Sequence, residues 1–411
     1  MAFLPKAILV STSSLFLLMT PVAAHAAEDA KTDDILDIIT PYADGRYRLE
    51  TVDQTGKPRD ATASTFRIKA GIVTKEVHGF SVKVEGETIA NIGAENFNDT
   101  LNGKTQFPVV ADPEDIALNQ AYVRWRKAGV ADVKVGRQVV NLDNQRWVGS
   151  VGWRQNDQTL DAAVATVMPF KGFSATYGYS WRANRIFGPD SPKGIFRNND
   201  VHLVHGSYRI PSFGSVTTYG YLLDMPQAPA ASSQTYGLRL AGGHRVGKVK
   251  LLLVAEYARQ SDHGRNPVNF DLDYIAIEPG IAVGGVTAKV GFERLEGNGT
   301  VALQTPLATL HKFNGWADKF LGTPANGLRD LYVDVTVKPK GPDWLKGTTF
   351  KAVYHDFNST RLGINYGHEW DFLVARKIGK HVSVSLKYAN YQAQGFATDT
   401  KKFWLTTQVK F

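Results

Sequence analysis

Arginine and lysine side chains recur at every second position of several short segments, and apolar side chains fill many of the positions between them. Arg46 and Arg48 flank Tyr47, for example. Ammonium and guanidinium groups bind carboxylates and phosphates, and the planar guanidinium does so with two parallel hydrogen bonds. The residues with this pattern are Arg46, Arg48, Arg67, Lys69, Arg124, Arg126, Arg182, Arg239, Lys351 and Lys387. The chemistry open to them is the binding of anions.

A period of two belongs to a β-strand, because successive side chains of a strand point to opposite faces. Alternating segments of about ten residues recur from Tyr42 onward, about eighteen in all, which is the length that a tilted strand needs to cross a bilayer. Short joints such as residues 378–380 alternate with long ones such as residues 91–117 and 296–329. The sequence therefore predicts an all-β fold over residues 42–411, a transmembrane antiparallel β-barrel with short periplasmic turns and long extracellular loops.

The barrel decides which way the charged side chains point. A charge facing the middle of the lipid would cost about 2–4 kcal/mol, so we predict that the basic residues named above line the lumen. An eighteen-stranded barrel is too wide for side chains to fill, and its lumen holds water. Rings of arginine and lysine around an aqueous pore favour anions. A second interpretation stays open, in which these charges only solvate the barrel interior.

Both ends of the chain carry targeting features. Residues 1–26 combine Lys6, an apolar stretch and a small-x-small pattern at residues 24–26, which predicts a cleaved signal peptide. We expect residues 27–41 to form a short periplasmic segment. The last strand ends in Phe411 and resembles the C-terminal signature of outer-membrane barrels, which implies recognition by the barrel-assembly machinery. The predicted location is the cell outer membrane of a Gram-negative bacterium.

Composition and spacing argue against other classes of protein. The chain has no cysteine, which excludes disulfides and thiol nucleophiles. Removing Lys6 leaves 46 basic against 39 acidic residues, a charge near +7, but the alternating placement of the basic residues argues against nucleic acid as a partner. His355 and Asp356 point to opposite faces of one strand, as do the rings of His202 and His205. We therefore predict no enzyme, no cofactor and no metal site.

Two blocks of the sequence resemble a known family. The first contains Gly136-Arg137-Gln138, Asp143-Asn144-Gln145-Arg146 and Gly152-Trp153-Arg154-Gln155-Asn156, and the second is the segment from His311 to Phe320. Both resemble blocks of the alginate-export family of outer-membrane barrels, over nearly the whole mature chain. The resemblance implies an eighteen-stranded monomeric barrel with an arginine-lined passage for a polyanionic polysaccharide. The turn at residues 378–380 is too short for the periplasmic plug of the dedicated alginate secretion channel, so we expect an anion-favouring channel ahead of alginate itself.

The resemblance also singles out loop residues. Arg137, Arg146 and Arg154 are candidates to reach a substrate carboxylate, and their alternative role is to pin the loop to the wall through Asp143, Asp157 and Asp161. The aromatic residues around Asp318 predict a packed loop helix, and residues 91–117 are long enough to fold inward as a gate.

We therefore predict a channel whose partners are outer-membrane lipid and an anionic solute or polysaccharide. An occluded structural or adhesive barrel is the alternative.

Overall fold

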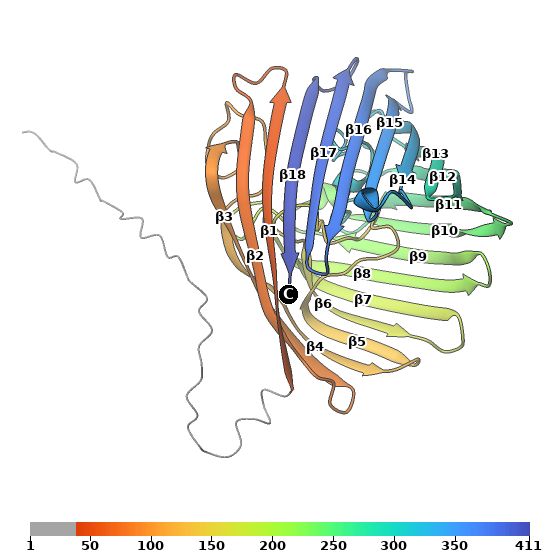
Figure 1. Ribbon diagram of the computed structural model, residues 1–411. Helices are drawn as coiled ribbons and strands as arrows, with labels where there is room; N and C mark the ends of the chain where they lie inside the picture. Colours follow the sequence, from red (N-terminus) through yellow and green to blue (C-terminus); the bar gives the residue numbers. More distant parts are fainter. Residues whose placement is uncertain (1–37) are drawn as a thin grey trace, which may run out of the picture. The chain divides into compact units, whose positions relative to one another are not determined.

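The computed structural model describes residues 38–411, and the predicted signal peptide at residues 1–26 lies outside the described residues. The described part forms one closed sheet (Figure 1). Its strands are β1 (Ile39–Gln54), β2 (Ala61–Thr74), β3 (Phe80–Asn96), β4 (Asp115–Lys127), β5 (Ala131–Gln138), β6 (Thr159–Val167), β7 (Phe173–Asn184), β8 (Ile195–Ile210), β9 (Gly214–Asp224), β10 (Ser233–Val246), β11 (Val249–Asp262), β12 (Asp271–Val283), β13 (Val286–Leu295), β14 (Leu328–Val337), β15 (Thr348–Asn358), β16 (Asn365–Ile378), β17 (Val382–Ala393) and β18 (Thr400–Lys410).

Closure of the sheet leaves no free strand edge. Each strand pairs antiparallel with its sequence neighbours, and β1 pairs with both β2 and β18. This arrangement satisfies the backbone groups that lipid cannot. The predicted fold class, an antiparallel barrel of about eighteen strands, is confirmed. The first strand begins at Ile39, slightly before the predicted start at Tyr42.

The two ends of the barrel differ in how they join strands. At one end the joints are short, and the two-residue turn Gly247-Lys248 between β10 and β11 is an example, with Gly247 at a φ of 58° that favours glycine. Residues 338–347, which contain the 3₁₀ turn η3 (Asp343–Leu345), are the longest joint at this end. At the other end the loops are longer. Numbered along the chain, these loops include L2 (residues 97–114), L3 (139–158) and L7 (296–327).

The outer face of the wall carries an apolar belt. Its exposed side chains include Val82, Val84, Val135, Val290, Val333, Val335, Phe372, Val374 and Leu386. In a soluble protein so large an exposed apolar surface would favour aggregation, whereas in a closed barrel it faces lipid. Within residues 38–411, no helix is both long enough and apolar enough to span a bilayer.

The main buried core lies inside the barrel, where L3 and L7 fold inward. Trp147 of L3 and Trp316 and Phe320 of L7 pack in one cluster with Trp404 of the wall. The two loops also touch through a parallel bridge between Val148 and Leu307. Folded loops therefore occupy the part of the lumen that wall side chains are too short to fill.

The predicted loop helix in L7 is wrong. Only the 3₁₀ turn η2 (Leu310–Lys312) forms, and no helix follows it. The backbone amides of Trp316 and Ala317 donate instead to wall carboxylates, those of Asp371 at 3.2 Å and Glu369 at 2.7 Å. The predicted packing of the aromatic residues is observed without the helix.

Replacing Leu386 with arginine tests the assignment of the faces. Leu386 is 42% exposed on the apolar belt, so Leu386→Arg should reduce the free energy of unfolding by about 2–4 kcal/mol. Ser385, its neighbour on β17, points the other way. Ser385→Arg should therefore change stability by less than about 1 kcal/mol. Urea unfolding in lipid vesicles measures both, and equal losses would contradict the assignment.

Candidate functional site

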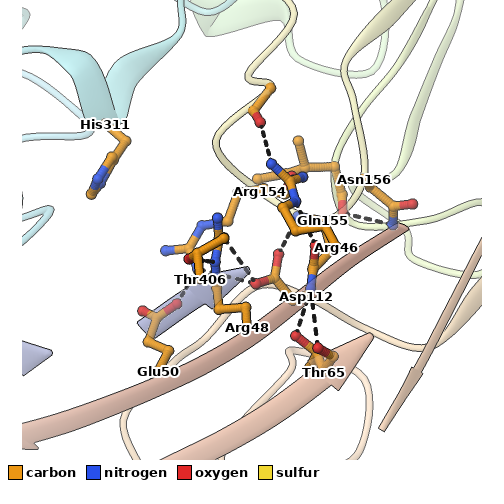
Figure 2. Close-up of polar contacts among 12 residues, drawn as sticks. Arg46, Arg48, Glu50, Thr65, Asp112, Arg154, Gln155, Asn156, His311 and Thr406 are labelled. Carbon is orange, nitrogen blue, oxygen red and sulfur yellow. Dashed lines mark hydrogen bonds and ion pairs between the residues drawn. The ribbon is translucent and has the colours of Figure 1, made fainter. Parts of the chain in front are cut away.

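Loop L3 is tied to the barrel wall at the predicted pore-lining residue Arg46. The Arg46 guanidinium donates to Gln155 Oε1 at 3.0 Å and to the carbonyl of Gly152 at 2.8 Å. The side-chain amide of Gln155 in turn donates to Thr65 Oγ1 at 2.8 Å, and its backbone amide donates to a carboxylate oxygen of Asp112, also at 2.8 Å (Figure 2). Asp112 belongs to L2. Residues 91–117 were expected to fold inward, and Asp112, near the end of that segment, does reach the interior.

Arg154 of L3 is the centre of the interior charge network. It contacts three carboxylates from three parts of the chain: Glu50 of β1 at 3.1 Å, Asp318 of L7 at 3.2 Å and Asp112 of L2 at 3.6 Å. Its side chain is only 8% exposed. Burial alone would lower the pKa of Arg154, but these carboxylates outweigh burial and raise that pKa, so the guanidinium stays charged. One cation therefore joins the wall to all three loops.

Lys387, another predicted pore-lining residue, lies between two indole rings. Its Nζ is 3.9 Å from the ring centroid of Trp153 and 3.7 Å from that of Trp316. The Arg48 guanidinium also lies over Trp153, at 4.3 Å. A cation–π contact with a desolvated cation contributes about 2 kcal/mol or more. Since Trp153 belongs to L3 and Trp316 to L7, Lys387 fastens both loops to β17.

A hydrogen-bonded chain continues from Lys387 into L7. Lys387 donates to His311 Nε2 at 2.8 Å, and the Nδ1–H of the neutral ring donates to Asp318 at 2.7 Å. Burial lowers the pKa of His311 to about 3. Burial would raise the pKa of Asp318, but contacts with His311, Lys402 and Arg154 hold it well below its usual range. Asp318 is therefore an anion shared by two loops and the wall.

Arg146 of L3 occupies a similar position on the other side of the lumen. It lies 3.0 Å from Glu293 of β13 and donates to Asn314 of L7, also at 3.0 Å. Asn314 donates to Glu293 at 2.6 Å, which closes a triangle of buried groups. Asp143 of L3 contacts His205 of β8 at 3.0 Å. The loop is thus anchored to opposite walls.

Only one of the expected loop pairings forms. Arg137 donates to Asp161 at 2.7 Å, as expected for pinning the loop. Asp157 pairs with Lys69 of β2 rather than with a loop arginine. Arg146 and Arg154 do pin L3 to the wall, but they do so through Glu293 and Glu50 and not through Asp143 and Asp157, because the loop enters the lumen and its arginines reach carboxylates of other elements. Pairing across the lumen gives no signal in sequence spacing.

The other predicted wall cations also have carboxylate partners. The pairs are Arg48–Asp112 (3.8 Å), Arg67–Asp44 (2.9 Å), Lys69–Glu87 (3.1 Å), Arg124–Asp132, Arg126–Glu76 (3.0 Å), Arg239–Glu256 and Lys351–Asp334 (2.8 Å). Sequence reasoning underrated these carboxylates. The same alternation that turns the cations inward also places Asp44, Glu87 and Asp132 on the inner face. The sequence pattern could therefore have identified them as partners of the cations. A cation paired with a carboxylate attracts an anionic solute more weakly than an unpaired cation does, because the two opposite charges partly cancel.

The prediction that Arg182 lines the lumen is wrong. Arg182 stands opposite Asp161 in the register, while the next row of partners, Leu160 and Ala183, is buried in the core inside the barrel. Arg182 therefore lies on the outer face, near the long-loop end. A β-bulge at Trp181 shifts the alternation and turns Arg182 outward.

A cavity of about 330 Å³ remains between L7 and the wall formed by β10 to β15. Its charged lining comprises Arg239, Glu278, Lys289, Glu293, Lys312, Asp330, Asp334 and Lys351, beside the rings of Phe313 and Trp316. Such a space can hold water and a small polar solute. Among the residues described, no group of three or more histidine and carboxylate side chains could hold a metal ion.

No family model matches the chain, and no curated protein sequence is significantly similar to it. The structure is similar to Acinetobacter baumannii OccAB4, with a TM-score of 0.74 and 13% identity over 91% of this chain and 98% of that chain. It is also similar to Pseudomonas aeruginosa OccK1 (OpdK), with a TM-score of 0.70 and 13% identity over 90% and 98% of the two chains. Pseudomonas aeruginosa OccK2 (OpdF), solved in complex with glucuronate, gives a TM-score of 0.69 at 12% identity over 91% and 98%.

These similarities establish the fold, which is that of outer-membrane porins. A closed barrel with an apolar outer belt is also the form in which β-proteins cross that membrane. The fold agrees with the predicted outer-membrane location and with a porin-like barrel. The finer resemblance to the alginate-export family gains no support from these comparisons.

Replacing Arg154 with glutamine should destabilise the barrel strongly. The substitution leaves the fully buried Glu50 without its ion-pair partner and Asp112 with Arg48 alone, which costs about 3–5 kcal/mol. Arg126→Gln is the matched control, because its side chain is 46% exposed and its pair with Glu76 contributes less than about 1 kcal/mol. Urea unfolding measures both free energies. Losses of similar size would contradict the central role of Arg154.

The pKa of His311 predicts a dependence of stability on pH. Its folded value of about 3 lies below the ordinary 6.5, so the contribution of the neutral ring is complete above about pH 6.5. That contribution is lost as the pH falls from 6.5 towards about 3. The free energy of unfolding measured from about pH 7 to pH 4 should fall, and His311→Asn should flatten this part of the curve. An unchanged slope in His311→Asn, equal to that of the exposed control His78→Asn, would refute the assignment.

Proposed function

We propose that the chain is an outer-membrane channel for anionic solutes and not an enzyme. The observation that carries the proposal is the lining of the lumen. Side chains of both charges cover the inner wall of an eighteen-stranded barrel, and the inward loops narrow this lumen yet leave a charged cavity beside L7. A barrel that served only as an anchor would not need a polar interior of this width.

The anion preference rests on an excess of basic side chains. Arg124, Arg126 and Lys134 face the lumen near the short-turn end, where they share the two carboxylates Asp132 and Glu76. The arginines keep part of their surface exposed. Partly hydrated cations of this kind raise the local concentration of anions without binding them tightly.

Two substrate classes fit this proposal. The resemblance of L3 and L7 to the alginate-export family favours a polyanionic sugar. The similar structures include OpdK with vanillate and OccK2 with glucuronate, both small carboxylates, and these favour small organic anions. Both classes carry carboxylates, which arginine recognises with paired hydrogen bonds. In the membrane the barrel would act as a monomer in contact with lipid, after assembly through the strand that ends in Phe411.

The interior network favours a second candidate, an occluded structural or adhesive barrel. L2, L3 and L7 meet at Arg154, and the cation–π contacts of Lys387 add to this closure. If these contacts persist at all times, the passage would be too narrow for solutes.

Single-channel recording of the refolded barrel in a planar bilayer under a salt gradient separates the two candidates. We expect stepwise conductance with a reversal potential displaced towards that of chloride. Arg124→Gln combined with Arg126→Gln should reduce the displacement, because Lys134 would then be the only one of the three cations left beside Asp132 and Glu76. Silence from a correctly folded barrel would overturn the channel and favour the occluded barrel.

A further inference from the structure

Five cations meet in one open concavity at the short-turn end of the barrel. The concavity has a volume of about 550 Å³ and lies among the turns that join β10 to β11, β12 to β13 and β14 to β15. Its charged lining residues are Arg245, Lys248, Lys250, Lys338 and Lys340, which we call the mouth cluster. Every charged residue in this lining is basic.

The mouth cluster differs from the rest of the wall in its lack of partners. Within residues 38–411, none of its five side chains forms an ion pair or donates a hydrogen bond to another residue. The nearest carboxylates along the same strands and turns are engaged elsewhere: Glu278 with Lys289, Asp334 with Lys351, and Asp343 with Lys346. Repulsion among the cluster is therefore not relieved by the protein.

The register increases this repulsion. Arg245 of β10 stands directly opposite Lys250 of β11, on the inner face. Like charges in this position lie about 5 Å apart at Cβ and destabilise a strand pair. The tight turn at Gly247-Lys248 brings a third cation to the same hairpin. An anion bound between these side chains would relieve the repulsion.

We propose that the mouth cluster binds multivalent phosphates. A single carboxylate would neutralise one of five cations, whereas a diphosphate group carries several charges in a volume that the concavity can hold. Arg245 can donate two parallel hydrogen bonds to one phosphate, and the lysines place further positive charges around that phosphate. The proposal does not depend on conduction by the barrel, so either can fail alone.

Calorimetric titration of the full barrel with pyrophosphate, in an uncharged detergent at low ionic strength, tests this site. We expect saturable binding of one pyrophosphate for each barrel. Arg245→Gln combined with Lys250→Gln should weaken it by about tenfold or more, since two charge-assisted contacts are lost. The matched control is Lys171→Gln combined with Lys380→Gln, which removes the same charge from the β6–β7 and β16–β17 turns of the same end and should change affinity by less than about twofold.

Binding that does not saturate, or equal weakening in the two double variants, would overturn the site and leave only diffuse attraction. All four side chains lie in or beside turns, so the variants should fold. Gel electrophoresis in detergent checks this, because a folded barrel changes its mobility when it is heated. Phosphate can come from solution or from a lipid headgroup. Repeating the titration in phosphatidylcholine vesicles with and without cardiolipin, a lipid with two phosphates, distinguishes the sources. Competition by cardiolipin identifies headgroups as the occupant, and its absence identifies a soluble phosphate.

Discussion

The ion pairs of Arg154 hold the interior of this barrel in place. A wall of eighteen strands encloses more space than its own side chains can fill, and in this barrel L3 and L7 enter the lumen and fill part of that space. Loops that enter carry polar groups out of water, and these groups need partners. Arg154 of L3 supplies the cation that Glu50, Asp112 and Asp318 share, and each of these carboxylates comes from a different element. Without this cation Glu50 would be a buried charge with no ion-pair partner, and the contact that joins L2, L3 and L7 to β1 would be lost.

This constraint divides the basic residues into two groups. Buried cations such as Arg48, Arg146 and Lys387 hold the loops inside the lumen, because they already contact carboxylates or indole rings of the protein. Cations near the short-turn end keep exposed surface, and the mouth cluster has no protein partner among the described residues. We therefore expect the proposed attraction of anions mainly at the short-turn end, while packing sets the narrow part of the lumen.

The fold could be predicted from the sequence because period-two alternation and the spacing of short and long joints are local signals. Alternation also placed residues such as Arg46 and Lys351 on the inner face. It failed at Arg182, where a one-residue bulge inverts the pattern without a mark in the sequence. The partners of Arg146 and Arg154 could not be predicted, because Glu293 and Glu50 lie more than a hundred residues away and meet the loop only after closure. The prediction of a helix in L7 was wrong because backbone amides of this segment donate to wall carboxylates instead of to helical carbonyls.

A double-mutant cycle on Arg154 and Glu50 tests the central claim most directly. The free energy of unfolding is measured for the parent barrel, Arg154→Gln, Glu50→Gln and the double variant. Because the two side chains are buried at 3.1 Å, the account predicts a coupling energy of about 2 kcal/mol or more. A coupling below about 0.5 kcal/mol would mean that the two substitutions act independently. That result would contradict the claim that this pair joins L3 to the wall.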